Sequence, residues 1–322
     1  MSINRKVVAL SGGIGGAKLA LGLYHVLRPN RLIVVTNTAD DFEHLGFYIS
    51  PDTDTVMYTL AGVNNKELGW GREEETWKFM EALAELGGEG WFRLGDRDLA
   101  THVLRTLGLG KGKKKLGEIT QILTERLGVQ AQIVPMSDDP VRTLVHTRDG
   151  KLSFQEYFVR DACDHVVTGF EFAGAETATP STKVLNALTD PGLEAIIICP
   201  SNPYISIDPI LAVPDYRQAL KDSVAPVVAV SPVIGGNSIK GPTAKIMHEL
   251  GVSVHSSSIS EHYGGLLDGL IVDSGDHITG KDVGIAVCKT RTVMETLEHK
   301  KALAADTLEF AGQISRGDFP VS

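Results

Sequence analysis

Short, nearly continuous apolar runs alternate along this chain with longer stretches in which apolar residues recur every three to four positions. The short runs are typical of strands that are buried on both faces of a sheet. The longer stretches are typical of helices that bury one side. Alternation of the two patterns predicts an α/β fold with a Rossmann-like, doubly wound and mainly parallel sheet. The clearest strand patterns are at residues 7–10, 32–36, 195–199 and 227–231.

Weaker patterns predict further strands, and the helical period predicts the helices that cover the sheet. The further strands are expected near residues 132–135, 143–146, 269–273 and 283–288. The helices are expected at residues 16–27, 54–60, 76–86, 98–107, 116–127, 182–188, 243–250 and 290–311.

The order of these patterns predicts three regions. Residues 1–53 and 176–322 carry the clearest strands and predict a Rossmann-like nucleotide-binding core. Residues 54–130 have almost wholly helical patterns, which predict a helical insertion that forms one wall of a site. Residues 131–175 contain alternating segments such as 152–160, which predict antiparallel or mixed strands in a small α/β subdomain.

The first predicted strand leads directly into the sequence SGGIGGAK at residues 11–18. Glycines let a backbone approach an anion closely, and the start of a helix attracts phosphate oxygens. The sequence differs from both common phosphate loops, because Lys18 stands where a Rossmann motif has glycine and Leu19 where a Walker loop has Ser or Thr. It predicts a phosphate site, and the alternative is a tight turn without a ligand. The candidate phosphate-binding residues are Ser11, Gly12, Gly13, Gly15, Gly16 and Lys18.

Small and polar residues follow each of the clearest strands, at residues 11–13, 37–41, 200–203 and 232–237. Ligands of doubly wound sheets bind outside the carboxyl ends of the strands. We therefore expect these loops to meet at one crevice.

Acidic residues cluster near the predicted phosphate loop: Asp40 and Asp41 follow the second strand, and Asp52 and Asp54 follow shortly after. Carboxylate oxygens are the ligands that Mg²⁺ prefers, and one carboxylate could also act as a general base. The alternative for Asp52 and Asp54 is that they cap the helix that begins near residue 55. For Asp52 both interpretations stay open.

The sequence WFRLGDRD at residues 91–98 places Trp91 and Phe92 beside Arg93 and further charged residues. Two aromatic rings next to hydrogen-bonding groups suit a planar heteroaromatic ligand with a polar tail. The alternative is that the aromatic residues belong to the core and that the charged residues form surface ion pairs.

Composition excludes several classes of protein. The net charge of −9 argues against a dedicated nucleic-acid binder, and the lysines at residues 111–115 are expected in a solvated loop. Three widely spaced cysteines fit neither a disulfide framework nor a zinc site, which predicts a reducing, cytoplasmic location. No apolar stretch is long enough for a membrane span, so no membrane partner is expected.

Taken together, these motifs have a specific resemblance over essentially the full length of the chain. The chain resembles the 2-phospho-L-lactate transferase family of deazaflavin coenzyme F-420 biosynthesis. The matching sequences are SGGIGGAK (11–18), NTADD (37–41), SPDTDTVMYTLAG (50–62), GWGREEETW (69–77), WFRLGDRDLATHVLRT (91–106), SDDPVRT (137–143), FQEYFVR (154–160), CPSNPYISIDPILAVP (199–214) and SPVIGGNSIKGPTAK (231–245).

The resemblance implies a magnesium-dependent reaction in the cytoplasm. The ribityl hydroxyl of the deazaflavin Fo attacks the phosphoryl group that bears lactate, or enolpyruvate, in a guanosine diphosphate-linked donor, and GMP is released. The resemblance also suggests a homodimer. Two alternatives remain: a nucleotide-sugar-binding regulatory protein of a sister branch with the same fold, and a nicotinamide oxidoreductase, which the altered glycine motif disfavours.

The resemblance also assigns roles to particular residues. Asp54 and Arg93, with Trp91 and Phe92, are expected to bind Fo. Asp54, Asp40 and Asp41 are expected to bind magnesium or to orient the hydroxyl, and the loop glycines to hold the diphosphate. The residues expected on the guanosine side are Ser201, Asn202, Ser231, Gly235, Gly236 and Asn237.

Overall fold

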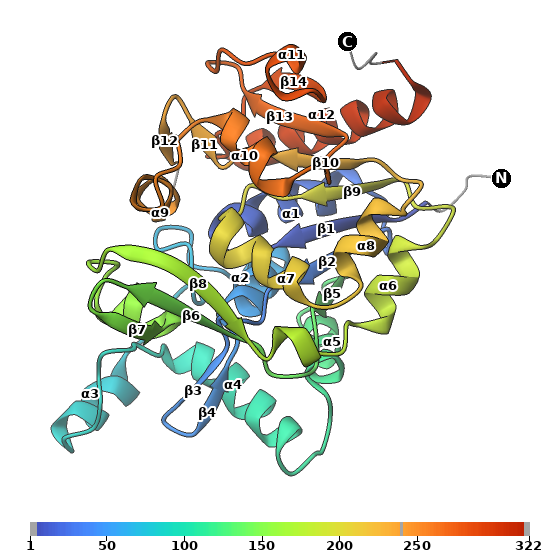
Figure 1. Ribbon diagram of the computed structural model, residues 1–322. Coiled ribbons are helices and arrows are strands. Elements are labelled where there is room, and N and C mark those ends of the chain that lie inside the picture. Colours follow the sequence, from blue (N-terminus) through green and yellow to red (C-terminus); the bar gives the residue numbers. More distant parts are fainter. Residues whose placement is uncertain (1–4, 239–240, 319–322) are drawn as a thin grey trace.

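The computed structural model describes residues 5–238 and 241–318, and these residues form a central sheet of seven parallel strands (Figure 1). The predicted doubly wound α/β fold is therefore confirmed. The sheet order is β14-β13-β10-β9-β1-β2-β5, which places β1 near the middle and β5 and β14 at the edges. The strands are β1 (Val7–Ser11), β2 (Leu32–Thr36), β5 (Gln132–Pro135), β9 (Ala195–Ile198), β10 (Val227–Val230), β13 (Gly269–Asp273) and β14 (Ala286–Thr290).

Both faces of the sheet are buried, because successive side chains of a strand point to opposite faces. In β1, Val7 and Ala9 belong to one core cluster, and Val8 and Leu10 belong to the other. The first face is covered by α1 (Gly13–Val26), α2 (Pro51–Ala61), α5 (Leu116–Arg126) and α12 (Leu297–Arg316). The second face is covered by α6 (Thr182–Leu188), α7 (Asp208–Ala212), α8 (Tyr216–Lys221), α9 (Thr243–Glu249) and α10 (Ser256–Tyr263).

Smaller elements lie outside the two helical layers. An antiparallel sheet is built from β6 (Arg142–Thr147), β7 (Gly150–Ser153) and β8 (Val167–Ala173), in the order β7-β6-β8. The remaining strands form the hairpins β3 (Phe42–His44) with β4 (Phe47–Ile49) and β11 (Val233–Ile234) with β12 (Asn237–Ser238), and the remaining α-helices are α3 (Lys78–Glu85), α4 (Asp96–Leu109) and α11 (Gly280–Val283). Figure 1 shows α3 and α4 on the side of the molecule that holds the β3–β4 hairpin.

The core takes more of the chain than the sequence patterns predict. Strand β5, in the segment 131–175 expected to form a separate subdomain, pairs with β2 as the edge of the central sheet. Helix α2 packs against α1 and α5 packs against β5, although both lie in the segment 54–130 predicted as an insertion. Only the part of that segment that carries α3 and α4 stands apart from the sheet (Figure 1).

Two of the predicted elements differ most from the structure. The last helix begins at Leu297 rather than at residue 290, because Thr290 completes β14 and the Thr296 hydroxyl accepts a hydrogen bond from His299 N at the true helix start. The predicted strand at 152–160 ends at Ser153 and is followed by a π-helical turn, Glu156–Arg160. None of the helices in the described ranges is long and apolar enough to cross a membrane.

Candidate active site

A cavity of about 510 Å³ lies outside the carboxyl ends of β1, β2, β9 and β10. The polar loops were expected to meet at this end of the parallel strands. Each of the loops at 12–15, 200–202 and 241–243 contributes lining residues, and so do Asp40 and Pro232. The expectation that strands far apart in the sequence converge on one crevice is therefore confirmed.

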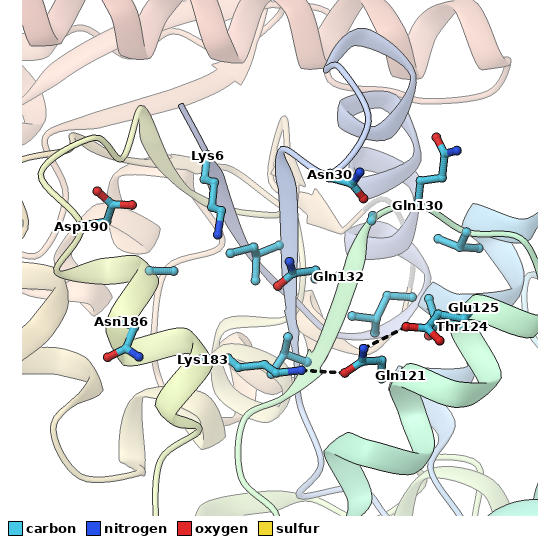
Figure 2. A pocket seen from close by; sticks show the side chains of 16 residues that line it. Lys6, Asn30, Gln121, Thr124, Glu125, Gln130, Gln132, Lys183, Asn186 and Asp190 are labelled. Atoms are coloured by element: carbon cyan, nitrogen blue, oxygen red, sulfur yellow. Dashed lines mark hydrogen bonds between the residues drawn. The ribbon is translucent and has the colours of Figure 1, made fainter. Parts of the chain in front are cut away.

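A second cavity, of about 530 Å³, lies at the other end of the sheet beside edge strand β5. Figure 2 shows that its walls come from α5 and α6, with Lys183 donating a hydrogen bond to Gln121 across the gap (2.7 Å). Its polar lining consists largely of surface amides and lysines near the amino ends of the strands. It contains none of the predicted site residues, so we assign the active site to the first cavity.

The glycine-rich loop packs tightly against the loop that follows β9. Ser201 Oγ accepts a hydrogen bond from Gly12 N (3.1 Å) and donates one to Gly12 O (2.8 Å). A Cβ atom on Gly15 would lie 2.3 Å from the carbonyl oxygen of Pro200, and one on Gly16 would lie 2.4 Å from Ser11 Oγ. These glycines are therefore needed for close contact between the two loops, and Ser11 and Gly16 do not line the cavity.

Gly15→Ala is therefore expected to destabilise the protein by about 1–3 kcal/mol, because the added methyl group overpacks a contact with backbone. Gly169→Ala, where the added atom meets open space, is the matched control and is expected to change stability little. Thermal melts of the two variants check this. Equal melting temperatures would show that Gly15 is not required for packing.

The first turn of α1 presents backbone amides to the cavity. Gly12 N binds Ser201, and Gly13 N donates to Asp52 Oδ1 (2.7 Å). No hydrogen bond of Ile14 N or Gly15 N outside the helix is found among the described residues. Nearby, the amide Nδ2 of Asn202 is buried and has no hydrogen-bond partner in the described part of the chain, although its Oδ1 accepts from Tyr204 N (3.0 Å). These donors, with Lys18 in the lining, could hold an anion.

Two of the predicted carboxylates face the cavity from different elements. Asp40 follows β2 and Asp52 lies in the first turn of α2. Burial raises the pKa of Asp52 to about 6, and burial together with the charge of Asp52 raises the pKa of Asp40 well above its usual range. Asp52 does not cap its own helix, since its carboxylate binds Gly13 of α1 and Asn37 Nδ2 (3.0 Å) instead.

The other two carboxylates do not line the cavity. Asp41 accepts hydrogen bonds from Ser50 Oγ (2.8 Å) and Tyr48 OH (3.0 Å), and burial raises the pKa of Asp41 to about 7. Asp54 forms a two-pronged ion pair with Arg105, whose side chain is fully buried. Their roles as metal ligands or catalytic groups stay predictions, because the structure gives each of them protein partners.

Asp54, Asp98 and His102 could offer metal-ligating atoms within 4.8 Å of one another. The guanidinium of Arg105 already lies against Asp54, with Nη1 3.0 Å from Oδ2, and Tyr58 OH donates to Asp98 (2.6 Å). A cation inside this group would meet the positive charge of Arg105. We therefore interpret these residues as an ion-pair network that joins α2 to α4.

Two groups of aromatic side chains line the cavity. The first group is Trp91 and Phe92 with the half-exposed Trp70, and together with Arg93 we call these residues the aromatic wall. Arg93 stacks on the ring of Trp77, 4.1 Å from its centroid. The three predicted residues of this wall are thus brought together at the cavity.

The sequence reasoning missed a second aromatic pair in the cavity lining. Phe154 and Phe158 stack on each other, with centroids 5.2 Å apart, and both line the cavity. Phe154 precedes the π-helical turn Glu156–Arg160 and Phe158 lies within it. This segment had been predicted as strand and noted for its resemblance, but it was not expected to contribute to the site. Ser206 and Thr55 are further lining residues that no pattern indicated.

The residues predicted on the guanosine side separate into two groups. Ser201 and Asn202 line the cavity, but the later four do not. Ser231 Oγ lies in a buried network with Ser256 (3.0 Å), and Gly235 N donates to Asp276 (2.9 Å). These contacts hold the loop that carries β11 and β12. The four residues outside the lining are Ser231, Gly235, Gly236 and Asn237.

Comparison with known proteins agrees with this geometry. The model of the family described as 2-phospho-L-lactate transferase CofD matches residues 7–302. The chain belongs to the 2-phospho-L-lactate transferase family. The resemblance seen in the motifs is thereby confirmed, and membership in this family identifies the chain as an enzyme of a transferase family.

Similar members carry two different names. The phosphoenolpyruvate transferase of Streptomyces griseus is 40% identical over 318 residues, which are 96% of this chain and 99% of that protein. The 2-phospho-L-lactate transferase of Methanosarcina acetivorans is 38% identical over 301 residues, 92% of this chain and 96% of that protein. Among solved structures, a UPF0052 family protein from Bacillus halodurans matches with a TM-score of 0.64 and 17% identity, covering 94% of this chain and 98% of that one. At this identity it supports the fold alone.

Proposed function

We propose that this protein transfers a 2-phospholactyl or phosphoenolpyruvyl group from a guanosine diphosphate-linked donor to the terminal ribityl hydroxyl of the deazaflavin Fo, in coenzyme F-420 biosynthesis. The hydroxyl oxygen forms a bond to the phosphorus that bears the three-carbon acid. The bond from that phosphorus to the bridging oxygen breaks, and GMP leaves. The observation that carries the proposal is a single cavity with anion-binding donors, two carboxylates and an aromatic wall.

The donor diphosphate fits the side of the cavity formed by the glycine-rich loop. The amides of Ile14 and Gly15, for which the described residues provide no partner, attract phosphate oxygens together with the positive end of α1. Lys18 adds a positive charge from the same helix, and Asn202 Nδ2 offers a buried donor. An unpartnered buried donor is costly, so a ligand oxygen that pairs with it gains affinity.

The acceptor fits the part of the cavity that the aromatic wall and the stacked rings of Phe154 and Phe158 line. A planar deazaflavin gains stacking energy against such rings, and its apolar ring surface is removed from contact with water. Arg93 can donate to the ring oxygens while Trp77 holds its guanidinium in place. In the proposed complex the ribityl chain extends from the aromatic wall to the carboxylates, which line the same cavity.

Magnesium fits the donor set at Asp40 and Asp52, because both side chains are carboxylates that line the cavity and repel each other. When bound there, the cation would neutralise charge on the transferred phosphoryl group. Asp40 accepts a hydrogen bond from Thr143 Oγ1 (3.2 Å), which orients its carboxylate. A carboxylate in the cavity lining can also receive the proton of the attacking hydroxyl, and we assign this role to Asp40.

A transfer assay tests the proposal. The purified protein is incubated with Fo, magnesium and either the phospholactyl or the enolpyruvyl guanylated donor. We expect GMP and a product heavier than Fo by the phosphoacid unit, and the faster donor identifies the physiological class. Tight nucleotide-sugar binding without transfer from either donor would instead favour the regulatory protein of the sister branch.

A further inference from the structure

The carboxylate of Asp52 occupies part of the predicted phosphate site. Its Oδ1 accepts a hydrogen bond from Gly13 N (2.7 Å), at the positive end of α1. Its Oδ2 accepts from Asn37 Nδ2 (3.0 Å) and lies only 2.7 Å from where a Cβ of Gly12 would be. Asp52 is therefore an internal anion held against the same loop that a diphosphate would use.

A diphosphate and this carboxylate compete for the same positive helix end and the same backbone amides. The first four amides of a helix lack partners within it, and here Gly12 N and Gly13 N are already used by Ser201 and Asp52. The carboxyl of Asp40 lines the same cavity and interacts electrostatically with Asp52. An incoming diphosphate thus meets two buried carboxylates in a region where water screens charge weakly.

We propose that Asp52 makes nucleotide binding conditional on a divalent cation. Without the cation, the charge of Asp52 repels the diphosphate, and the hydrogen bond from Gly13 N to Asp52 keeps that amide from a phosphate oxygen. With a cation held by the carboxylates, that charge is neutralised and the diphosphate can use the loop. The inference rests on the proposed function and adds to it a requirement that the cation binds before or together with the donor.

The test measures GDP affinity by calorimetry, with protein freed of metal by a chelator and then with magnesium added. Wild-type protein is expected to bind GDP at least about tenfold more tightly with magnesium. Asp52→Asn keeps an oxygen that can accept from Gly13 but lacks the charge. It is expected to bind GDP without metal at least about tenfold more tightly than wild type, and to gain little from magnesium.

Two controls separate the charge of Asp52 from other effects. Asp208→Asn removes a carboxylate that pairs with His262 (2.9 Å) outside the cavity lining, and it should bind GDP as wild type does. Asp52→Glu retains the charge and should retain the dependence on magnesium. If Asp52→Asn does not fold, Asp52→Ser, which also removes the charge, is measured in its place.

Two outcomes overturn the inference, and they are distinguishable. If a folded, charge-free variant binds metal-free GDP no better than wild type, Asp52 does not oppose the nucleotide, and the proposed function stands. If wild type does not bind GDP with or without magnesium, the guanylated donor of the proposed function is wrong and the inference fails with it.

Discussion

The Asp54→Asn variant is expected to lose about 3–5 kcal/mol of folding stability, because it leaves the guanidinium of Arg105 buried without its counter-charge. The side chain of Arg105 has no exposed surface, and Asp54 is its two-pronged partner. His102 Nδ1 also lies 3.8 Å from Asp54, so the loss extends to the contact between α2 and α4. Chemical denaturation of the variant and wild type checks the prediction.

Two further variants test whether the buried ion pair accounts for the loss of stability. Glu298→Gln breaks an exposed ion pair with Lys301 and should cost less than about 1 kcal/mol. Replacing both buried partners, as Asp54→Leu with Arg105→Met, should recover much of the stability, since apolar pairs often replace buried ion pairs without loss. If Asp54→Asn is as stable as wild type but inactive, the ion-pair interpretation is wrong and a catalytic role for Asp54 is supported.

Much of the central sheet could be predicted because most of its strands are recognisable from their own residues. Parallel strands covered on both faces are continuous apolar runs, so the positions of β1, β2, β9 and β10 follow from the sequence to within a residue or two. Strand β5 was found, but its place beside β2 was not. Its partner is about a hundred residues away in the chain, and no local pattern specifies a pairing at that distance.

The carboxylates show why residue types are easier to predict than their roles. Asp52 and Asp54 lie two positions apart on α2, and this spacing turns their side chains about 200° from each other around the helix. If one of the two carboxylates faces the cavity, the other must face away from it. The choice depends on Arg105, which lies 51 residues beyond Asp54 and was not recognised as a core residue.

The same limit applies to the predicted guanosine-side residues. Small and polar residues after β10 were expected near the crevice because they follow a strand of the sheet, and the resemblance assigned them to the guanosine side. In the structure Ser231 and Gly235 pair with Ser256 and Asp276 from later elements, so these polar groups already have partners in the protein, and their role toward guanosine stays a prediction. A strand-end position indicates nearness to the crevice, and only the tertiary contacts show which groups remain available to a ligand.

The Asp40→Asn variant is expected to reduce turnover by at least about a hundredfold while the protein stays folded. Asn has nearly the same shape and can still accept from Thr143, but it can neither receive the proton nor neutralise a cation. The pKa of Asp40 is raised by burial and by Asp52, so at neutral pH its ionised form costs stability and the neutral variant should melt no lower than wild type.

The measurements are turnover of Fo at saturating donor, the magnesium concentration for half-maximal rate, and a thermal melt. Asp40→Asn should lower turnover and raise the magnesium requirement together. Asp41→Asn is the matched control, since it neutralises the adjacent carboxylate, whose partners are Ser50 and Tyr48 and which does not line the cavity. Normal turnover and an unchanged magnesium requirement in folded Asp40→Asn would contradict its assignment. Loss of turnover in Asp41→Asn alone would move the catalytic carboxylate one residue along the chain.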